Sequence, residues 1–203
     1  MFRFAVIATG TALASLLYLL PAQAAPAVGK PAPAFTGTDT TGKTWDLNEL
    51  KGTSVILEWT NHDCPYVRKH YDSGNMQALQ RDATAAGYTW LSVISSAPGK
   101  QGNVSPAQAD TLTQSRGAAP TAVLLDPEGT IGRAYGARTT PHMFIIDREG
   151  TLVYMGGIDD RPSTNVADIE GAENYVRRAI ADLDAGRPIG EPVTRPYGCS
   201  VKY

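Results

Sequence analysis

Residues 59–67 read Trp59-Thr60-Asn61-His62-Asp63-Cys64-Pro65-Tyr66-Val67, with a cysteine directly before a proline. An apolar run, Val55-Ile56-Leu57, comes just before this stretch and predicts a buried strand. Proline suits the first position of a helix, because its missing N–H would have no partner there. The stretch therefore predicts a strand that ends at the corner and a helix that begins at Pro65, with Cys64 as its N-cap.

A thiol at this N-cap lies at the positive end of the helix dipole, which favours the charged thiolate. Asn61, His62 and Asp63 make the surroundings of Cys64 polar. A lone cysteine is commonly a small buried hydrophobe, but so polar a corner favours a reactive thiol. Reactive-thiol chemistry at Cys64 is the first functional hypothesis.

Residues 1–24 have the pattern of a cleaved signal peptide. Arg3 supplies a positive charge, the run from Phe4 to Leu20 is almost wholly apolar, and Ala22-Gln23-Ala24 carries small residues where signal peptidase reads them. The alternative is an uncleaved membrane anchor, but the apolar run is at the lower limit for spanning a bilayer. We expect an exported protein, periplasmic or secreted, that meets the membrane only through this signal.

Composition limits the remaining possibilities. The rest of the chain suits one domain with its own core. The full sequence has a formal net charge of −2, or −3 without Arg3, and it contains no basic run, so the footprint of a nucleic-acid-binding protein is missing. The two cysteines, Cys64 and Cys199, both lie in the exported part. In an oxidising compartment such a pair forms a disulfide or takes part in thiol exchange.

Hydrophobic patterns predict an alternation of strands and helices. Strands are predicted at residues 44–46, 54–59, 88–94, 122–125, 143–146 and 151–155, and helices at 65–86 with an interruption at 72–75, at 105–116, at 130–135 and at 167–185. This order predicts the α/β class, with a mixed sheet between helices. Residues 187–203 form a tail that carries Cys199.

Three features occur together along residues 25–186. Cys64 lies at a strand-to-helix corner, Thr140-Pro141 comes just before a strand, and Asp147-Arg148-Glu149-Gly150 closes a hairpin. In these features the chain resembles the thioredoxin-like superfamily, and within it the redoxin branch related to AhpC/TSA peroxiredoxins. The resemblance implies a thioredoxin-like fold, in which helices flank a mixed central sheet.

The sequence at the corner differs from the motifs of thioredoxins and of peroxiredoxins. Thioredoxins have Cys-x-x-Cys, but the fourth position here is Val67. Peroxiredoxins have Pro-x-x-x-Thr/Ser-x-x-Cys, and the matching positions here are Leu57 and Asn61, which offer no hydroxyl to orient a peroxide. The sequence is similar instead to a redoxin subgroup with Asn-His-Cys-Pro-Tyr-Val-type corners and a late Gly-Cys-Ser tail, although Asp63 is inserted here before the cysteine. A single cysteine thus stands in place of the dithiol.

The resemblance also suggests roles for residues around the thiol. Glu58 stands where thioredoxins keep a buried acid that handles protons, and burial would raise the pKa of such a carboxyl. The alternative is a glutamate at a sheet edge or in a salt bridge. Thr140 and Pro141 are implied to form a cis bond that faces the thiol and pairs with an extended substrate, with Tyr66 as a further substrate contact.

Two histidines are candidates for stabilising the thiolate. His62 or His142 could do so as an imidazolium, whereas a lone histidine is more often packed or at the surface. Together with Cys64 and Cys199 they could also bind copper or zinc. No pair has the spacing of metal ligands on a helix, so we predict neither a metal nor a cofactor.

Cys199 decides the mechanism. If the tail folds back, Cys199 can attack a mixed disulfide or a sulfenic acid on Cys64 and resolve it. A permanent bridge and pairing between chains are the alternatives. The leading hypothesis is an exported thiol–disulfide oxidoreductase, with Cys64 as nucleophile, Cys199 as resolving thiol, and protein or small-molecule thiols and disulfides as partners. A thiol peroxidase of atypical motif, a copper or zinc chaperone and a non-catalytic binding module are the alternatives.

Overall fold

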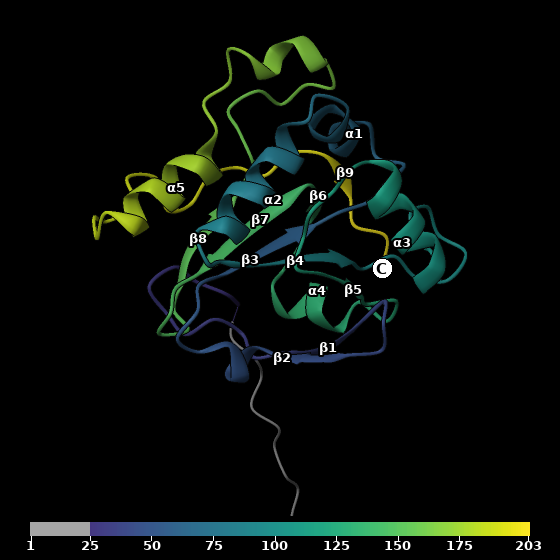
Figure 1. The fold of residues 1–203 in the computed structure, drawn as a ribbon, viewed down its shortest axis with the longest axis horizontal. Helices are drawn as coiled ribbons and strands as arrows, with labels where there is room; N and C mark the ends of the chain where they lie inside the picture. The colour runs from purple at the N-terminus through teal and green to yellow at the C-terminus, as the bar shows by residue number, and fades with distance from the viewer. Residues whose placement is uncertain (1–24) are drawn as a thin grey trace, which may run out of the picture.

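A mixed sheet of seven strands lies at the centre of the protein (Figure 1). The computed structural model describes residues 25–203. The strands of the sheet are β1 (Thr36–Asp39), β2 (Thr44–Asp46), β3 (Val55–Trp59), β4 (Thr89–Ile94), β5 (Ala122–Leu125), β7 (His142–Ile146) and β8 (Leu152–Gly156). They are arranged in the order β2-β1-β5-β4-β3-β7-β8. Strands β3, β4 and β5 run parallel to one another, and the outer strands pair antiparallel.

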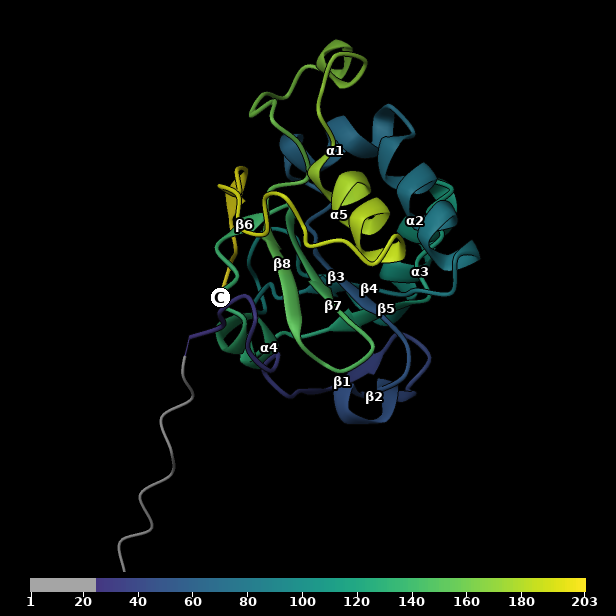
Figure 2. The same cartoon turned by 90° about the vertical axis from the view of Figure 1, so that its left-hand side faces the viewer.

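Helices lie on both faces of this sheet, which confirms the predicted α/β class (Figures 1 and 2). They are α1 (Pro65–Asp72), α2 (Asn75–Ala85), α3 (Pro106–Ser115), α4 (Thr130–Ala134) and α5 (Tyr175–Asp184), with two 3-10 turns, η1 (Leu47–Leu50) and η2 (Val166–Ile169). Two further strands, β6 (Thr139–Thr140) and β9 (Cys199–Ser200), form a small separate ladder.

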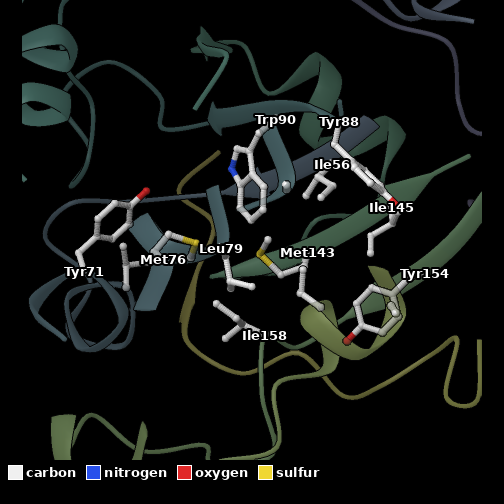
Figure 3. Packing of buried hydrophobic residues seen from close by; sticks show 14 of the residues in the cluster. Ile56, Tyr71, Met76, Leu79, Tyr88, Trp90, Met143, Ile145, Tyr154 and Ile158 are labelled. Carbon is white, nitrogen blue, oxygen red and sulfur yellow. The ribbon is translucent and has the colours of Figure 1, made fainter. Parts of the chain in front are cut away.

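The core is divided into two main clusters by the alternation of side chains along the strands. On one face, Ile56, Met143 and Ile145 pack against α1, α2 and α5, and Figure 3 shows them around Met76 and Leu79 of α2. On the other face, the second cluster packs against α4 and η1. Strand β3 is buried along its whole length, because it is covered on both faces and paired on both edges. Its apolar sequence, interrupted only by the buried Glu58, follows from this position.

The helix boundaries agree with the sequence except at one place. The predicted interruption at residues 72–75 is confirmed, because Gly74 has a φ of +76° and separates α1 from α2. The helix predicted at 167–185 begins instead at Tyr175, and that prediction was wrong for its first turns. The side chain of Asn174 accepts from the amide of Arg177 at 2.9 Å and caps the helix there.

The C-terminal tail runs back across the sheet (Figure 2). The amide of Met155 in β8 donates to the carbonyl of Pro192 at 3.0 Å, and the amide of Thr194 donates to Met155 at 3.2 Å. Further on, β9 pairs antiparallel with β6. The tail is thus hydrogen-bonded to two parts of the domain, while a division of the chain at residue 186 stays a sequence prediction.

The predicted signal peptide, residues 1–24, lies outside the described residues. Within residues 25–203, no helix is long and apolar enough to cross a membrane.

Phe144 is central to the second cluster and gives a test of the fold. Its ring centroid lies 5.1 Å from that of Trp59 and 5.3 Å from that of Tyr135. We expect Phe144→Ala to lower the free energy of unfolding by about 3–5 kcal/mol, because it leaves a cavity in a fully buried layer. Urea denaturation measures the loss. Val166→Ala, at a residue that is 42% exposed, is the control and should change stability by less than about 0.5 kcal/mol. A Phe144→Ala variant as stable as its parent would contradict this packing.

Candidate active site

Cys64 lies at the N-terminus of α1, where the sequence predicts it. It is the N-cap residue, with extended backbone dihedrals, and Pro65 follows as the first helical residue. The side chain is completely buried, and its Sγ donates to the carbonyl of Thr140 at 3.1 Å. The peptide bond between Thr140 and Pro141 is cis. The corner and the loop with the cis-proline thus meet at the sulfur of Cys64.

Cys199 lies on the other side of the same loop. In the antiparallel ladder of β6 and β9, Cys199 is directly opposite Thr140. Both cysteines are free thiols, and Cys199 packs against the cluster that contains Cys64. The fold therefore brings together the two cysteines of the chain, although they are far apart in the sequence.

The two thiols have opposite pKa shifts. Burial would raise the pKa of Cys64, but interactions with Cys199, with the side chain of Thr140 and with the backbone amide of Val67 together lower it. Burial and the neighbouring Cys64 raise the pKa of Cys199 to about 12. Of the pair, Cys64 is the thiol that ionises more readily and is suited to act as nucleophile.

The side chain of Thr140 offers a reason for this preference. Its Oγ1 is buried and has no hydrogen-bond partner within residues 25–203. While Cys64 keeps its proton, the thiol donates to the carbonyl of Thr140. Once the proton leaves, the sulfur becomes an acceptor, and the hydroxyl of Thr140 can donate to it. The hydroxyl of Thr140 thus has a hydrogen-bond partner when Cys64 is a thiolate and none when it is a thiol, which favours the thiolate.

Glu58 is buried in β3 within a closed set of hydrogen bonds. Its Oε1 accepts from the hydroxyl of Tyr71 at 2.8 Å. Its Oε2 accepts from Ser92 at 2.8 Å, from Trp90 at 2.9 Å and from Gln80 at 3.0 Å. Burial and the neighbouring Glu58 raise the pKa of Tyr71 well above its usual value, so this phenol stays protonated and donates. No hydrogen bond joins Glu58 to Cys64 in the described residues.

A small cavity of about 10 Å³ adjoins this network. Tyr71 and Ser92, which both donate to Glu58, line it together with Thr60 and His62. The space is sufficient for about one water molecule. Oγ1 of Thr60 and Nδ1 of His62 are buried without a partner in residues 25–203, so both can exchange a hydrogen bond with such a molecule. The cavity connects the surroundings of Glu58 with the loop that precedes Cys64.

The histidines do not contact the thiol of Cys64 through any hydrogen bond in the described residues. Nε2 of His62 lies 3.4 Å from the carboxylate of Asp63. His142 stacks on Phe144 with ring centroids 4.4 Å apart, on the face of the sheet opposite to the cluster of Cys64. Burial, and then Arg138, lower the pKa of His142 to about 3, so this ring is neutral at pH 7.

A buried polar cluster lies beside the site, and no pattern in the sequence predicts it. Lys69 on α1 is fully buried, and its Nζ lies 3.3 Å from Asp159 and 3.4 Å from the hydroxyl of Tyr197. That hydroxyl also donates to Asp159 and lies 3.1 Å from Nε2 of His70. The ring of Tyr66, a predicted substrate contact, meets Tyr197 edge-on at 5.9 Å. The cluster thus joins α1 to the tail just before Cys199.

His70 acts in this cluster as a neutral donor. The amide of Asn75 lies 2.9 Å from Nδ1 of His70, so that nitrogen accepts and Nε2 carries the hydrogen that points at Tyr197. Burial lowers the pKa of His70 to about 4, with Asp159 acting against the shift. Lys69 and Asp159 bring opposite charges together in this cluster and offset each other.

A metal site is not evident in the geometry. Within the part of the chain that the structure describes, no three or more His, Cys, Asp or Glu side chains are grouped as the ligands of a metal ion would be.

Comparison with known structures supports a thioredoxin-like fold. An uncharacterized conserved protein from Geobacillus kaustophilus is 26% identical, with a TM-score of 0.75 over 87% of this chain and 92% of its own. A hypothetical protein from Sinorhizobium meliloti is 23% identical, with a TM-score of 0.72 over 89% and 96%. A protein from Chlorobium tepidum, provisionally named the thiol:disulfide interchange protein DsbE, is 25% identical, with a TM-score of 0.52 over 64% and 85%.

No curated protein matches the chain significantly. A family model described as the AhpC/TSA family matches residues 28–155, which is more than half of the chain and includes the corner, β7 and most of β8. The thioredoxin-like redoxin resemblance of the sequence is thereby confirmed, and the chain belongs to the AhpC/TSA family.

Proposed function

We propose that this protein is an exported thiol–disulfide oxidoreductase, in which Cys64 is the nucleophile and Cys199 the resolving thiol. The observation that carries the proposal is the pairing of Thr140 with Cys199, which sets the second thiol beside the first although no Cys-x-x-Cys is present. The signal-peptide pattern of residues 1–24 supports export. The likeness to the Chlorobium tepidum protein supports disulfide exchange as the reaction.

The reaction proceeds in two exchanges. The Cys64 thiolate attacks one sulfur of a substrate disulfide, a mixed disulfide forms, and the other substrate sulfur leaves and takes up a proton. Cys199 then gives up its proton and attacks the sulfur of Cys64, so that a Cys64–Cys199 disulfide forms and the second substrate sulfur leaves. Two electrons pass from the cysteine pair to the substrate. An external dithiol reduces the pair again, and the reverse sequence oxidises a dithiol substrate.

The second exchange needs a base, because Cys199 holds its proton tightly. We assign this role to Glu58, acting through Tyr71 and the small cavity near His62. The hydrogen bonds to Glu58 fix its position. Tyr71 and His62 line the cavity but neither cysteine does, so in this proposal the proton passes from the thiol to the cavity across the loop of His62. Substrate binding is assigned to the loop of Thr140 and Pro141, with Tyr66 beside it.

A thiol peroxidase is the second candidate, favoured by the family and by the hydroxyl of Thr140. This hydroxyl belongs to the cis-proline loop and would donate to the thiolate from there, whereas peroxiredoxins carry theirs in the corner motif. In this reaction the Cys64 thiolate attacks one oxygen of a peroxide, a sulfenic acid forms, and the other oxygen leaves as water or alcohol after protonation. Cys199 then displaces water and forms the same disulfide.

Substitution of each cysteine tests the main proposal. We expect Cys64→Ser to abolish the reduction of a cystine-containing model peptide, because the remaining thiol, Cys199, has a raised pKa and forms little thiolate. Cys199→Ser should still attack but not resolve, so the mixed disulfide accumulates and is seen by intact-mass spectrometry. Far-UV circular dichroism controls for folding. Turnover by a folded Cys64→Ser variant would be incompatible with the proposal.

The role of Glu58 predicts a selective kinetic defect. We expect Glu58→Gln to slow the loss of the mixed disulfide more than its formation, because only the second exchange needs the base. Its new amide also faces buried donors, so stability should fall by about 1–3 kcal/mol. Ser92→Ala is the matched control, since it removes one donor and keeps the carboxyl. Rapid-quench mass spectrometry measures both steps, and resolution by Glu58→Gln at the rate of the Ser92→Ala control would contradict the role.

Peroxide consumption tests the second candidate. If the protein is a peroxidase, stopped-flow mixing should show hydrogen peroxide consumed faster than by free cysteine. Thr140→Val, which keeps the shape of the side chain and removes its hydroxyl, should slow this reaction about tenfold or more, in the range of a lost transition-state donor. Thr140→Ser should keep the rate. Consumption no faster than by free cysteine excludes the peroxidase.

A further inference from the structure

The last residues of the chain occupy the groove beside Cys64. Strand β9 adds to β6 with Thr140 opposite Cys199, and the next amide, that of Val201, donates to the carbonyl of Arg138 at 3.0 Å. An extended peptide that adds to the edge of a sheet uses backbone groups in this same way. The tail is therefore bound to β6 as an extended protein substrate would be.

The fit between the tail and the loop leaves no spare room. Gly198 has a φ of +140°, and a Cβ at this position would lie 2.0 Å from the carbonyl oxygen of Thr140. Only glycine allows the two backbones to approach so closely. Behind this contact, Cys64 has no exposed surface at all. A folded substrate cannot reach the sulfur while the tail is in place.

Tyr197 fixes the tail immediately before this contact. Its hydroxyl donates to the buried Asp159 and is approached by Lys69 and His70, and its ring meets Tyr66 edge-on. A hydrogen bond to a charged group inside a protein is stronger than one between neutral groups. Asp159 and Lys69 keep their own ion pair when Tyr197 leaves, so the cluster can open without leaving either charge unpaired.

We propose that residues 197–203 are an intramolecular occupant of the substrate groove, that Tyr197 is the latch that holds them, and that this segment leaves the groove before a protein thiol or disulfide reaches Cys64. The nature of the displacing substrate rests on the proposed function. Access to the Cys64 sulfur, in contrast, can be measured without any turnover. A result that contradicts the role of the tail therefore leaves the proposed oxidoreductase function untouched, and the reverse holds as well.

The test measures how fast a bulky maleimide modifies Cys64. Every variant spans residues 25–203 and carries Cys199→Ser, so that Cys64 is its one thiol. We expect Tyr197→Phe to raise the labelling rate roughly ten- to a hundredfold, the equivalent of one hydrogen bond to a charged group. Gly198→Ala should also raise it, because its methyl group collides with Thr140.

Tyr88→Phe is the matched control, and it should leave the labelling rate unchanged. It removes the same hydroxyl from a carboxylate, that of Asp184 at 2.7 Å. Tyr88 precedes β4, whereas Cys64 follows the parallel strand β3, so the two lie at opposite ends of the sheet. Equal rates for Tyr197→Phe and its parent, or fast labelling of the parent itself, would overturn the latch.

Dilute urea distinguishes release of the tail from unfolding of the whole domain. Opening of a short segment exposes little surface, so the labelling rate of Tyr197→Phe should hardly change with urea. A steep rise with urea shows that labelling occurs through global unfolding and overturns the proposal. A synthetic peptide that copies residues 195–203 with Cys199→Ser should slow the labelling of the Gly198→Ala variant, and a peptide without effect would show that the groove is no peptide site.

Discussion

The hydrogen bond from the thiol of Cys64 to the carbonyl of Thr140 joins the parts of the chain on which the site depends. The carbonyl belongs to a loop that pairs on its other side with Cys199, so a single backbone segment sets the positions of both sulfurs. The hydroxyl of the same threonine is buried without a hydrogen-bond partner in the described residues, so it can donate to the thiolate. Thioredoxins have two cysteines within four consecutive residues, whereas the two cysteines of this chain lie at a corner and in the tail, with the loop of Thr140 between them. In this chain tertiary contacts, and not a short sequence motif, bring the two cysteines to the same loop.

How far the sequence predicts this arrangement depends on the range of each signal. The apolar run before Cys64 and the proline after it are local, and the strand, the corner and the helix are where they indicate. The late start of α5 depends on a single capping asparagine, Asn174, that the hydrophobic pattern outweighed. The path of the tail could not be predicted, because β6 and β9 pair over two residues each and no periodicity arises from so short a ladder.

The contacts of buried polar groups could not be predicted from the sequence either, because their partners are distant in the chain. Lysine is rarely fully buried, and nothing in the local sequence indicates that Asp159 and Tyr197 surround Lys69. Glu58 is conspicuous in the sequence because it interrupts an apolar strand, but its four donors come from three other elements. A buried charge without a partner is strongly destabilising, so each charged side chain in these clusters needs at least one partner. Glu58 and its donors fix β3 against α1, and the ion pair of Lys69 and Asp159 persists whether or not Tyr197 of the tail is bound to it.

Complete burial of the thiol has a consequence for oxidative damage. A cysteine sulfenic acid becomes irreversibly oxidised when a second peroxide molecule arrives before a thiol does. At this site the neighbouring thiol is already on the adjacent strand, whereas any second oxidant has to diffuse past the residues that cover the sulfur. Under the proposed function, hyperoxidation of Cys64 would compete with attack by Cys199, which needs no diffusion. The residues that cover the sulfur would then slow the entry of substrate and of a second oxidant alike, so resistance to oxidant stress would come at the expense of rapid access.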